Sequence, residues 1–395
     1  MNSNKPIKPN LCPECNIPEM TNHKITKIIG ILSILNKKRI TMETTEKLEP
    51  LEPSYPTYKN LDLREKISLI SDPENYCLMM TMDSSDAINN KRAMTTKEFI
   101  PRAYELEALS AVKSWRTNAR WLKDIPIIID YVSENEMKPD ILKELLALNV
   151  SIYYSNYKEQ TKDHHYGFIN VHMTGKYLPK KLDTLETSPS NQPCPFRKFV
   201  IHIDTDMSCL QPIPASFLMP LAEDKIIIGG YNEIELPYQR KALFSDTILN
   251  SDLIITKLEE TSEIYSKFID NINYINDLHK QDKYLYLDDD RITVGQPPRV
   301  FDIEEYGVDR TYQKEQHRFH VVGIEEYQRG EGYYSDPLNP IGAYFWHEHK
   351  LDFRYPGFDA TKLEKYDEIV QDQIERVRAK MNLELKIKER YRNVD

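Results

Sequence analysis

The segment 199–207 constrains this chain more than any other, because an apolar run ends there in two acids. Its first five residues are mostly apolar and β-branched, which is typical of a buried strand. Asp204 and Asp206 follow at once, one residue apart. In an open α/β sheet, the residues that follow the carboxyl end of a strand border the crevice where ligands bind. We therefore expect the acid pair to lie at a binding site.

Two carboxylates this close repel each other unless a proton or a cation lies between them. Oxygen ligands favour hard divalent cations such as Mg²⁺ and Mn²⁺. Such a cation also binds diphosphates, so the working hypothesis for Asp204 and Asp206 is a metal site in a sugar-nucleotide transferase. The structural alternative is a simple turn, since aspartate favours turns after strands.

Strands and helices alternate before this segment. Apolar runs predict strands over 76–82, 125–132 and 150–154. Between them, apolar residues at helical spacing predict a helix over 104–121 and a second one that begins at Pro139. This alternation is typical of parallel βαβ units. The predicted fold class is therefore α/β, with a mostly parallel sheet and helices on both faces.

The second half of the chain is less regular. Further strands are expected over 225–230 and 251–255, and a helix over 259–275. Residues 157–198 are predicted to be irregular, and residues 296–340 show no clear period.

The composition suggests three parts. Residues 1–60 are rich in Pro, Asn, Lys, Glu and Thr, and we expect a flexible extension there. Residues 61–355 are predicted to form the catalytic domain. Residues 356–395 are predicted to form a charged helix that packs on this domain or extends from it.

Charge and cysteine content narrow the function classes. A net charge of −10 argues against a nucleic-acid partner, which would need a basic face. The five cysteines are scattered and odd in number, which indicates a reducing compartment rather than a disulfide framework. Cys12 and Cys15, with His23, form half of a zinc-site pattern. No second pair follows at the usual spacing, so an unstructured tail is the preferred interpretation.

The longest apolar run near the N-terminus, residues 28–35, is too short to cross a membrane. Its position and polar flanks also do not suit a signal peptide. We therefore expect no transmembrane segment and a soluble, cytoplasmic protein. Export by a route without a cleaved signal is the alternative.

With these elements in order, the chain resembles the GT-A fold of glycosyltransferases over roughly residues 75–350. Within this fold it is most similar to the glycogenin-like and bacterial-toxin-like retaining enzymes. Residues 202–213 resemble the family's DxD motif with its hydrophobic turn, and residues 287–290 resemble a later acidic motif. Residues 250–255 resemble an asparagine motif, except that Asp252 stands where the family has glycine.

The resemblance implies a donor-binding role for several residues. Asp206 would bind Mn²⁺ or Mg²⁺ directly, and Asp204 would reach the metal through water or contact the ribose. His347 or His349 would complete the metal shell, and Lys350 would bind the β-phosphate of the nucleotide sugar. The structural alternative for the two histidines is a surface pair.

The resemblance also implies residues for the base and the sugar. The nucleotide base would meet the end of the first strand, formed by Met80, Thr81 and Met82. Asp289 would orient the donor sugar or stabilise positive charge on it, and Asp288 and Asn250 would complete the catalytic set. The expected donor is a UDP-sugar, and retention of configuration is slightly favoured. The acceptor, whether protein, glycan, lipid or small molecule, stays open.

Two other function classes stay open. In a phosphatase of the haloacid-dehalogenase type, a strand also ends in Asp-x-Asp, with a nucleophile followed by a general acid. Residues 288–290 would then hold magnesium. That motif normally ends the first strand of its domain, whereas three predicted strands come earlier here. The third class is a non-catalytic effector or binding module, for which 288–290 would be an exposed turn.

Overall fold

The computed structural model describes residues 57–84, 103–155, 157, 169–183, 197–232, 247–280, 301–323, 328–329 and 344–347. Six exposed helical residues between 368 and 386 are also described. The chain divides into two units, Met1–Pro56 and Thr57–Asp395, and all described residues belong to the second. Residues 1–56 of the predicted N-terminal extension and most of the predicted C-terminal helix therefore lie outside the described residues. Among the described helices, none has the length and hydropathy that a bilayer span requires.

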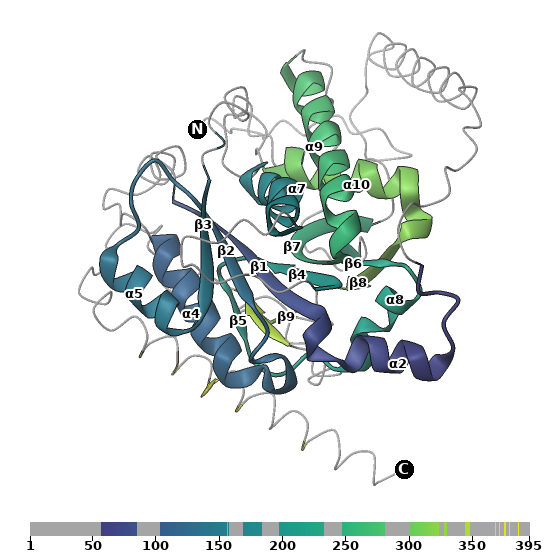
Figure 1. The fold of residues 1–395 in the computed structure, drawn as a ribbon. Helices are drawn as coiled ribbons and strands as arrows, with labels where there is room; N and C mark the ends of the chain where they lie inside the picture. The colour runs from purple at the N-terminus through teal and green to yellow at the C-terminus, as the bar shows by residue number, and fades with distance from the viewer. Residues whose placement is uncertain are drawn as a thin grey trace, which may run out of the picture. The chain divides into compact units, whose positions relative to one another are not determined.

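A mixed seven-stranded sheet forms the centre of the second unit (Figure 1). Its order is β3-β2-β1-β4-β7-β6-β8, and β7 alone runs antiparallel to its neighbours. The strands are β1 Tyr76–Asp83, β2 Ile127–Val132, β3 Val150–Ser155, β4 Phe199–Ile203, β6 Ile226–Asn232, β7 Thr247–Lys257 and β8 Phe319–Gly323. The predicted mixed, mostly parallel sheet is confirmed, and it is the sheet that the GT-A resemblance implies.

Helices cover both faces of this sheet, as predicted (Figure 1). One face carries α2 Leu63–Ser71, α4 Ala103–Asn118, α5 Pro139–Ala147 and α8 Met219–Ala222. The other face carries α7 Ile169–Asp183, α9 Leu258–Lys280 and α10 Phe301–Glu315. Short 3₁₀ turns lie at η1 Pro73–Asn75, η2 Arg120–Leu122, η3 Ala215–Leu218 and η6 Gln316–Arg318. Successive side chains of a strand point to opposite faces of the sheet, and most of the strand residues are apolar, so both faces need a cover of helices.

A second, small sheet packs against α4. It consists of β5 Met207–Cys209, β10 Phe345–His347 and β9 Gln328–Arg329, in the order β5-β10-β9. The α4 side chains Ser114 and Asn118 hydrogen-bond the backbone N–H and carbonyl of Cys209, each at 2.8 Å. The rings of Trp115 and Phe345 stack with centroids 6.2 Å apart. These contacts fix the segment that follows the acid pair.

One prediction for the less regular regions needs correction, and one region without a predicted element contains regular structure. Residues 157–198 are not wholly irregular, because α7 lies within them. Residues 296–340, for which no element was predicted, contain α10 and β8. Both helices carry a glycine, and α7 also has an internal Pro179, so their intrinsic helix propensity is low at these positions. Tertiary contacts stabilise them instead.

One such contact centres on Asp130, which is fully buried in β2. Its carboxylate accepts hydrogen bonds from Ser155 at 2.6 Å, Tyr157 at 2.6 Å and Thr174 of α7 at 2.7 Å. Three donors satisfy a buried carboxylate that would otherwise be costly. The result is that α7 is held against the carboxyl halves of β2 and β3.

The glycines of α7 and α10 allow close helix packing. A Cβ atom at Gly175 would overlap with the ring of Tyr265 on α9, and one at Gly307 would overlap with Ile272. Tyr265 is almost fully buried, and its hydroxyl is hydrogen-bonded to His202, so its ring has little room to move. The two glycines therefore set the distance of α7 and α10 from α9.

We predict that Gly175→Ala destabilises the protein. Alanine favours a helix interior by about 1 kcal/mol relative to glycine. Overpacking a well-filled core typically costs about 1–3 kcal/mol and here also displaces Tyr265. Urea denaturation should therefore show a net loss in the free energy of unfolding. Thr117→Ala, at an exposed position of α4, serves as the control and should change this free energy little. A Gly175→Ala protein as stable as the parent would contradict the packing argument.

Candidate active site at the carboxyl edge of the sheet

The acid pair lies in a tight turn between the two sheets. β4 ends at Ile203, and the turn 204–207 is closed by a hydrogen bond from the Met207 N–H to the Asp204 carbonyl at 3.2 Å. Asp204 is partly buried and Asp206 is 8% exposed. Because β4 lies in the middle of the sheet, the turn projects from the centre of its carboxyl edge. This is the position that the sequence predicts for a ligand site.

The register of the small sheet brings a distant segment to this turn. β10 runs antiparallel to β5, with His347 opposite Met207 and Trp346 opposite Ser208. The backbone of His347 is therefore next to the residue that follows Asp206. The His347 side chain lies outside the described part of the structure. The role of His347 as a metal ligand stays a prediction, and the position of its backbone opposite Met207 suits that role.

The predicted asparagine motif also approaches the turn. Asn250 lies on β7 opposite Gly229 of β6, and its side chain lies outside the described atoms. Two residues later, the carbonyl of Asp252 accepts a hydrogen bond from the Asp204 N–H at 3.2 Å. Between them, the β6–β7 ladder shifts register at a bulge. Bulges often occur next to active sites, where they redirect side chains.

The residues predicted to meet the nucleotide base are buried. Met80 and Met82 are packed in the core on the α4 side, and Thr81 points to the opposite face. Their side chains are therefore not the ones that a base in the crevice could stack on. The strand ends at Asp83, whose carboxylate accepts a hydrogen bond from Asn170 of α7 at 2.6 Å. A base-binding role for this end of β1 stays a prediction.

Four other predicted site residues are not placed. Asp288, Asp289, His349 and Lys350 all lie outside the described residues. Among the residues that are described, no group of three or more His, Cys, Asp or Glu side chains is arranged to hold a metal ion. The set of candidate metal ligands can therefore be judged by its chemistry only. It consists of two carboxylates in one turn and one neighbouring histidine. Oxygen and imidazole ligands of this kind suit Mn²⁺ or Mg²⁺.

Directly behind the acid turn lies a buried histidine that the sequence analysis did not single out. His202 of β4 contacts Tyr265 of α9 through Nδ1 at 2.5 Å and Thr81 of β1 through Nε2 at 3.4 Å. A neutral imidazole donates through one nitrogen and accepts through the other, so both contacts can be satisfied together. Burial, with a smaller contribution from His172, lowers the pKa of His202 to about 3. Burial also raises the pKa of Tyr265 well above its usual value, and the charge of Asp204 adds to this effect.

A second buried cluster lies on the same face of the sheet. Glu304 of α10 accepts hydrogen bonds from His172 of α7 at 2.7 Å and from Ser251 of β7 at 2.9 Å. The sequence analysis missed these residues because α7 and α10 were not predicted. The signal was weak, because His172 and Glu304 lie in different segments with more than one hundred residues between them.

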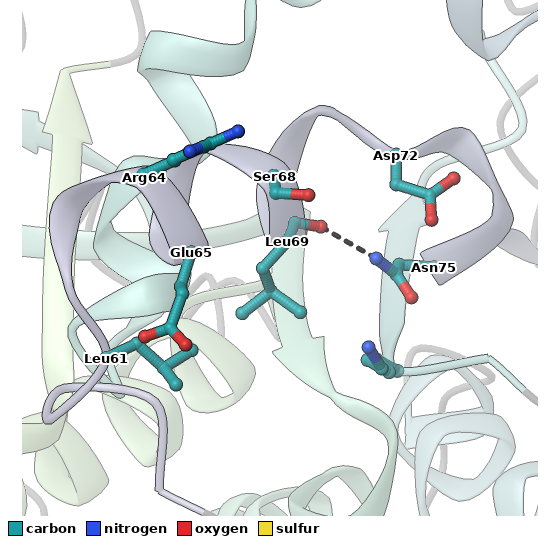
Figure 2. A pocket seen from close by; sticks show the side chains of 8 residues that line it. Leu61, Arg64, Glu65, Ser68, Leu69, Asp72 and Asn75 are labelled. Carbon is teal, nitrogen blue, oxygen red and sulfur yellow. Dashed lines mark hydrogen bonds between the residues drawn. The ribbon is translucent and has the colours of Figure 1, made fainter.

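The structure also contains a pocket of about 420 Å³ at the opposite edge of the sheet (Figure 2). Its lining comes from α2 and the residues that flank this helix, together with Asn75 and Lys198, which precede β1 and β4. Figure 2 shows the side-chain amide of Asn75 donating a hydrogen bond to the Leu69 carbonyl at 2.8 Å. Because ligands of open α/β sheets bind at carboxyl ends, we place the candidate site at the acid turn and not in this pocket.

Comparisons with known proteins give little further guidance. No family model matches the chain, and no curated protein matches it. Among solved structures, that of mouse xyloside xylosyltransferase 1 in its apo form is similar at 14% sequence identity. The match covers 69% of this chain and 97% of that one, with a TM-score of 0.37. At this TM-score we draw nothing from the similarity.

We predict a specific pH dependence from His202. In the unfolded chain a histidine binds a proton near pH 6.5, whereas folded His202 does so near pH 3. Between these values the unfolded state holds the extra proton, so the contribution of this residue is full above pH 6.5 and is lost as the pH falls towards 3. His202→Gln should remove up to about 1.4 kcal/mol per pH unit from the slope of unfolding free energy against pH. Urea denaturation of metal-free protein from pH 7.5 to 4.5 measures this slope. Parallel curves for the two proteins would show that folded His202 titrates normally.

Proposed function

We propose that this protein is a glycosyltransferase that moves a sugar from a nucleotide-sugar donor, with a divalent cation held at the acid turn. The observation that supports this most directly is the pairing of β5 with β10. It brings His347 from the far end of the domain to the turn that carries Asp204 and Asp206. The turn itself lies at the carboxyl edge of a mostly parallel sheet, where such donors bind.

The ligand set fits a hard cation. Asp206 would bind it directly, Asp204 would reach it through water or contact the ribose, and His347 or His349 would supply an imidazole. Because Asp206 is largely shielded from solvent, its interaction with a cation is screened less than at an exposed site. Bound Mn²⁺ or Mg²⁺ would supply neutralisation of the negative charge that develops on the departing nucleoside diphosphate.

Other residues would bind and orient the donor. Lys350 follows the histidine segment in the chain and would hold the β-phosphate. Asp288, Asp289 and Asn250 would orient the sugar, and the end of β1 would accommodate the base. We favour a UDP-sugar and retention of configuration because of the GT-A resemblance. We also favour the cytoplasm as the location, because the five cysteines of the sequence are scattered and odd in number.

A phosphatase of the haloacid-dehalogenase type is the second candidate, because it also ends a strand in Asp-x-Asp. The order of strands disfavours it. β4 follows three parallel strands of the same sheet, whereas that motif normally ends the first strand of its domain. Hydrolysis of p-nitrophenyl phosphate with Mg²⁺ would favour the phosphatase, and we expect none.

We predict that Asp206→Asn abolishes sugar-nucleotide chemistry. The variant keeps the shape of the side chain but loses the charge that attracts a cation. Mn²⁺-dependent hydrolysis or transfer from a panel of UDP- and GDP-sugars should fall by about 100-fold or more. Asp140→Asn, at an exposed position in the first turn of α5, is the matched control and should keep full activity. Circular dichroism should show both variants folded. Activity that survives Asp206→Asn would place the site elsewhere.

We also predict that Mn²⁺ stabilises the folded protein. A ligand that binds only the native state adds about 2.7 kcal/mol at one hundred times its dissociation constant. The melting temperature of the parent should therefore rise with Mn²⁺ and UDP, and that of Asp206→Asn should not. No rise in the parent would favour a non-catalytic binding module.

A further inference from the structure

Glu304 connects three elements behind the acid turn. It lies in the first turns of α10, and its Oε1 accepts both the Ser251 hydroxyl of β7 and Nε2 of His172 on α7. The His172 side chain is fully buried, and the Glu304 side chain is 14% exposed. A carboxylate at such a place is costly unless hydrogen bonds satisfy it, so the cluster has one strongly preferred arrangement.

Ser251 lies where the sheet is least regular. Gly229 of β6 pairs with Asn250, but the preceding Ile228 pairs with Ile254. Residues 251–253 are therefore left out of the ladder between β6 and β7. Without regular ladder bonds, the conformation of a bulge depends on other contacts. For Ser251 that contact is the hydrogen bond to Glu304.

The bulge in turn holds the acid turn. Asp252 is the neighbour of Ser251, and its carbonyl accepts the Asp204 N–H at 3.2 Å. On the other side of the bulge, Leu253 pairs with Ile203 at the end of β4. A displacement of Ser251 would therefore reach Asp204 through a single peptide unit and one hydrogen bond.

We propose that Glu304 is a positioning residue for the acid turn. It holds Ser251 and α7 in one place, and the fixed bulge then sets the backbone of Asp204 relative to Asp206. Glu304 itself does not contact the reacting atoms. The part of this proposal that concerns metal binding rests on the glycosyltransferase function proposed above. The effect of Glu304 on the backbone of the acid turn can be measured without metal.

Geometry rather than charge carries this role, because both hydrogen bonds end on the same oxygen, Oε1. Glu304→Gln keeps an amide oxygen that can accept both bonds. Glu304→Ala removes both. A further carboxylate on the same helix serves as the control: Glu315 is 19% exposed and accepts from Lys267 and Arg318 at the opposite edge of the sheet.

The first measurement is amide hydrogen exchange in metal-free protein, followed by mass spectrometry of peptides that cover residues 203–209. In Glu304→Ala we expect exchange of this segment to be about 10-fold faster, because loss of a hydrogen bond to a carboxylate changes local opening by this order. Glu304→Gln and Glu315→Ala should leave the segment unchanged. If Glu304→Ala instead accelerates exchange throughout the sheet, or nowhere near the turn, the proposal is overturned.

The second measurement is Mn²⁺ affinity in the presence of UDP, by electron paramagnetic resonance of free Mn²⁺. Residues that orient metal ligands typically contribute about 10- to 100-fold in affinity, and we expect about 10-fold weaker binding for Glu304→Ala. Ser251→Ala should reproduce this loss. The double variant should bind Mn²⁺ no more weakly than either single variant, because both substitutions act on the turn by removing the Ser251–Glu304 hydrogen bond. Glu304→Gln should restore the affinity of the parent.

The outcomes separate the two proposals. Normal exchange and normal Mn²⁺ affinity in Glu304→Ala would overturn the positioning role and leave the proposed function intact. A second outcome is that the parent does not bind Mn²⁺, while Glu304→Ala and Ser251→Ala alone show faster exchange at the acid turn. This outcome would support the positioning of the turn by Glu304 and refute the proposed function. If Glu304→Ala does not fold, Ser251→Ala is the milder variant and decides in its place.

Discussion

Complete burial of β4 is the constraint on which the rest of this structure depends. All five of its residues are buried, with apolar side chains packed under α4 on one face and under α7 and α9 on the other. A strand of this kind has no exposed side, so only its ends can carry groups that meet solvent or ligand. The acids of 204–206 lie at one such end. Every neighbour that fixes them, whether β1, β7 or the small sheet, is held in register by β4 or by the turn that follows it.

Both faces of the sheet contain buried polar contacts. On the α4 face, beside an apolar cluster that includes Met80 and Met82, the Tyr131 hydroxyl donates a hydrogen bond to the Glu105 carboxylate at 2.8 Å. The α7–α9–α10 face contains buried polar contacts, in which His202 meets Tyr265 and His172 meets Glu304. Apolar packing tolerates small shifts, whereas a buried hydrogen bond is satisfied in one arrangement only. The contacts of His202 and Glu304 therefore help to specify the positions of α7, α9 and α10 directly behind the acid turn.

How much of this could be predicted from the sequence depends on the type of contact. Strands β1 to β4 and helix α5 were predicted because their apolar pattern reports burial directly. Helices α7 and α10 were missed because their stability comes from particular partners. Gly175 and Gly307 weaken each helix locally but permit the close approach of α9. The acid turn could be found because the two aspartates are separated by only one residue in the chain. The Glu304 cluster could not, because its members meet only after α7, β7 and α10 have packed.

Asp252 shows how a departure from a family pattern can be compatible with the same local structure. The resembled enzymes have glycine here, which would matter if the backbone required a positive φ. Asp252 instead lies within β7, and the described non-glycine residues with positive φ are Arg120, Asn149 and Asp224. An extended conformation accepts any side chain without strain. The contact between position 252 and the acid turn is made by the backbone carbonyl, which accepts a hydrogen bond from the Asp204 N–H. Every residue type has such a carbonyl. With aspartate at position 252, the backbone contact is present and a buried carboxylate lies beside the turn.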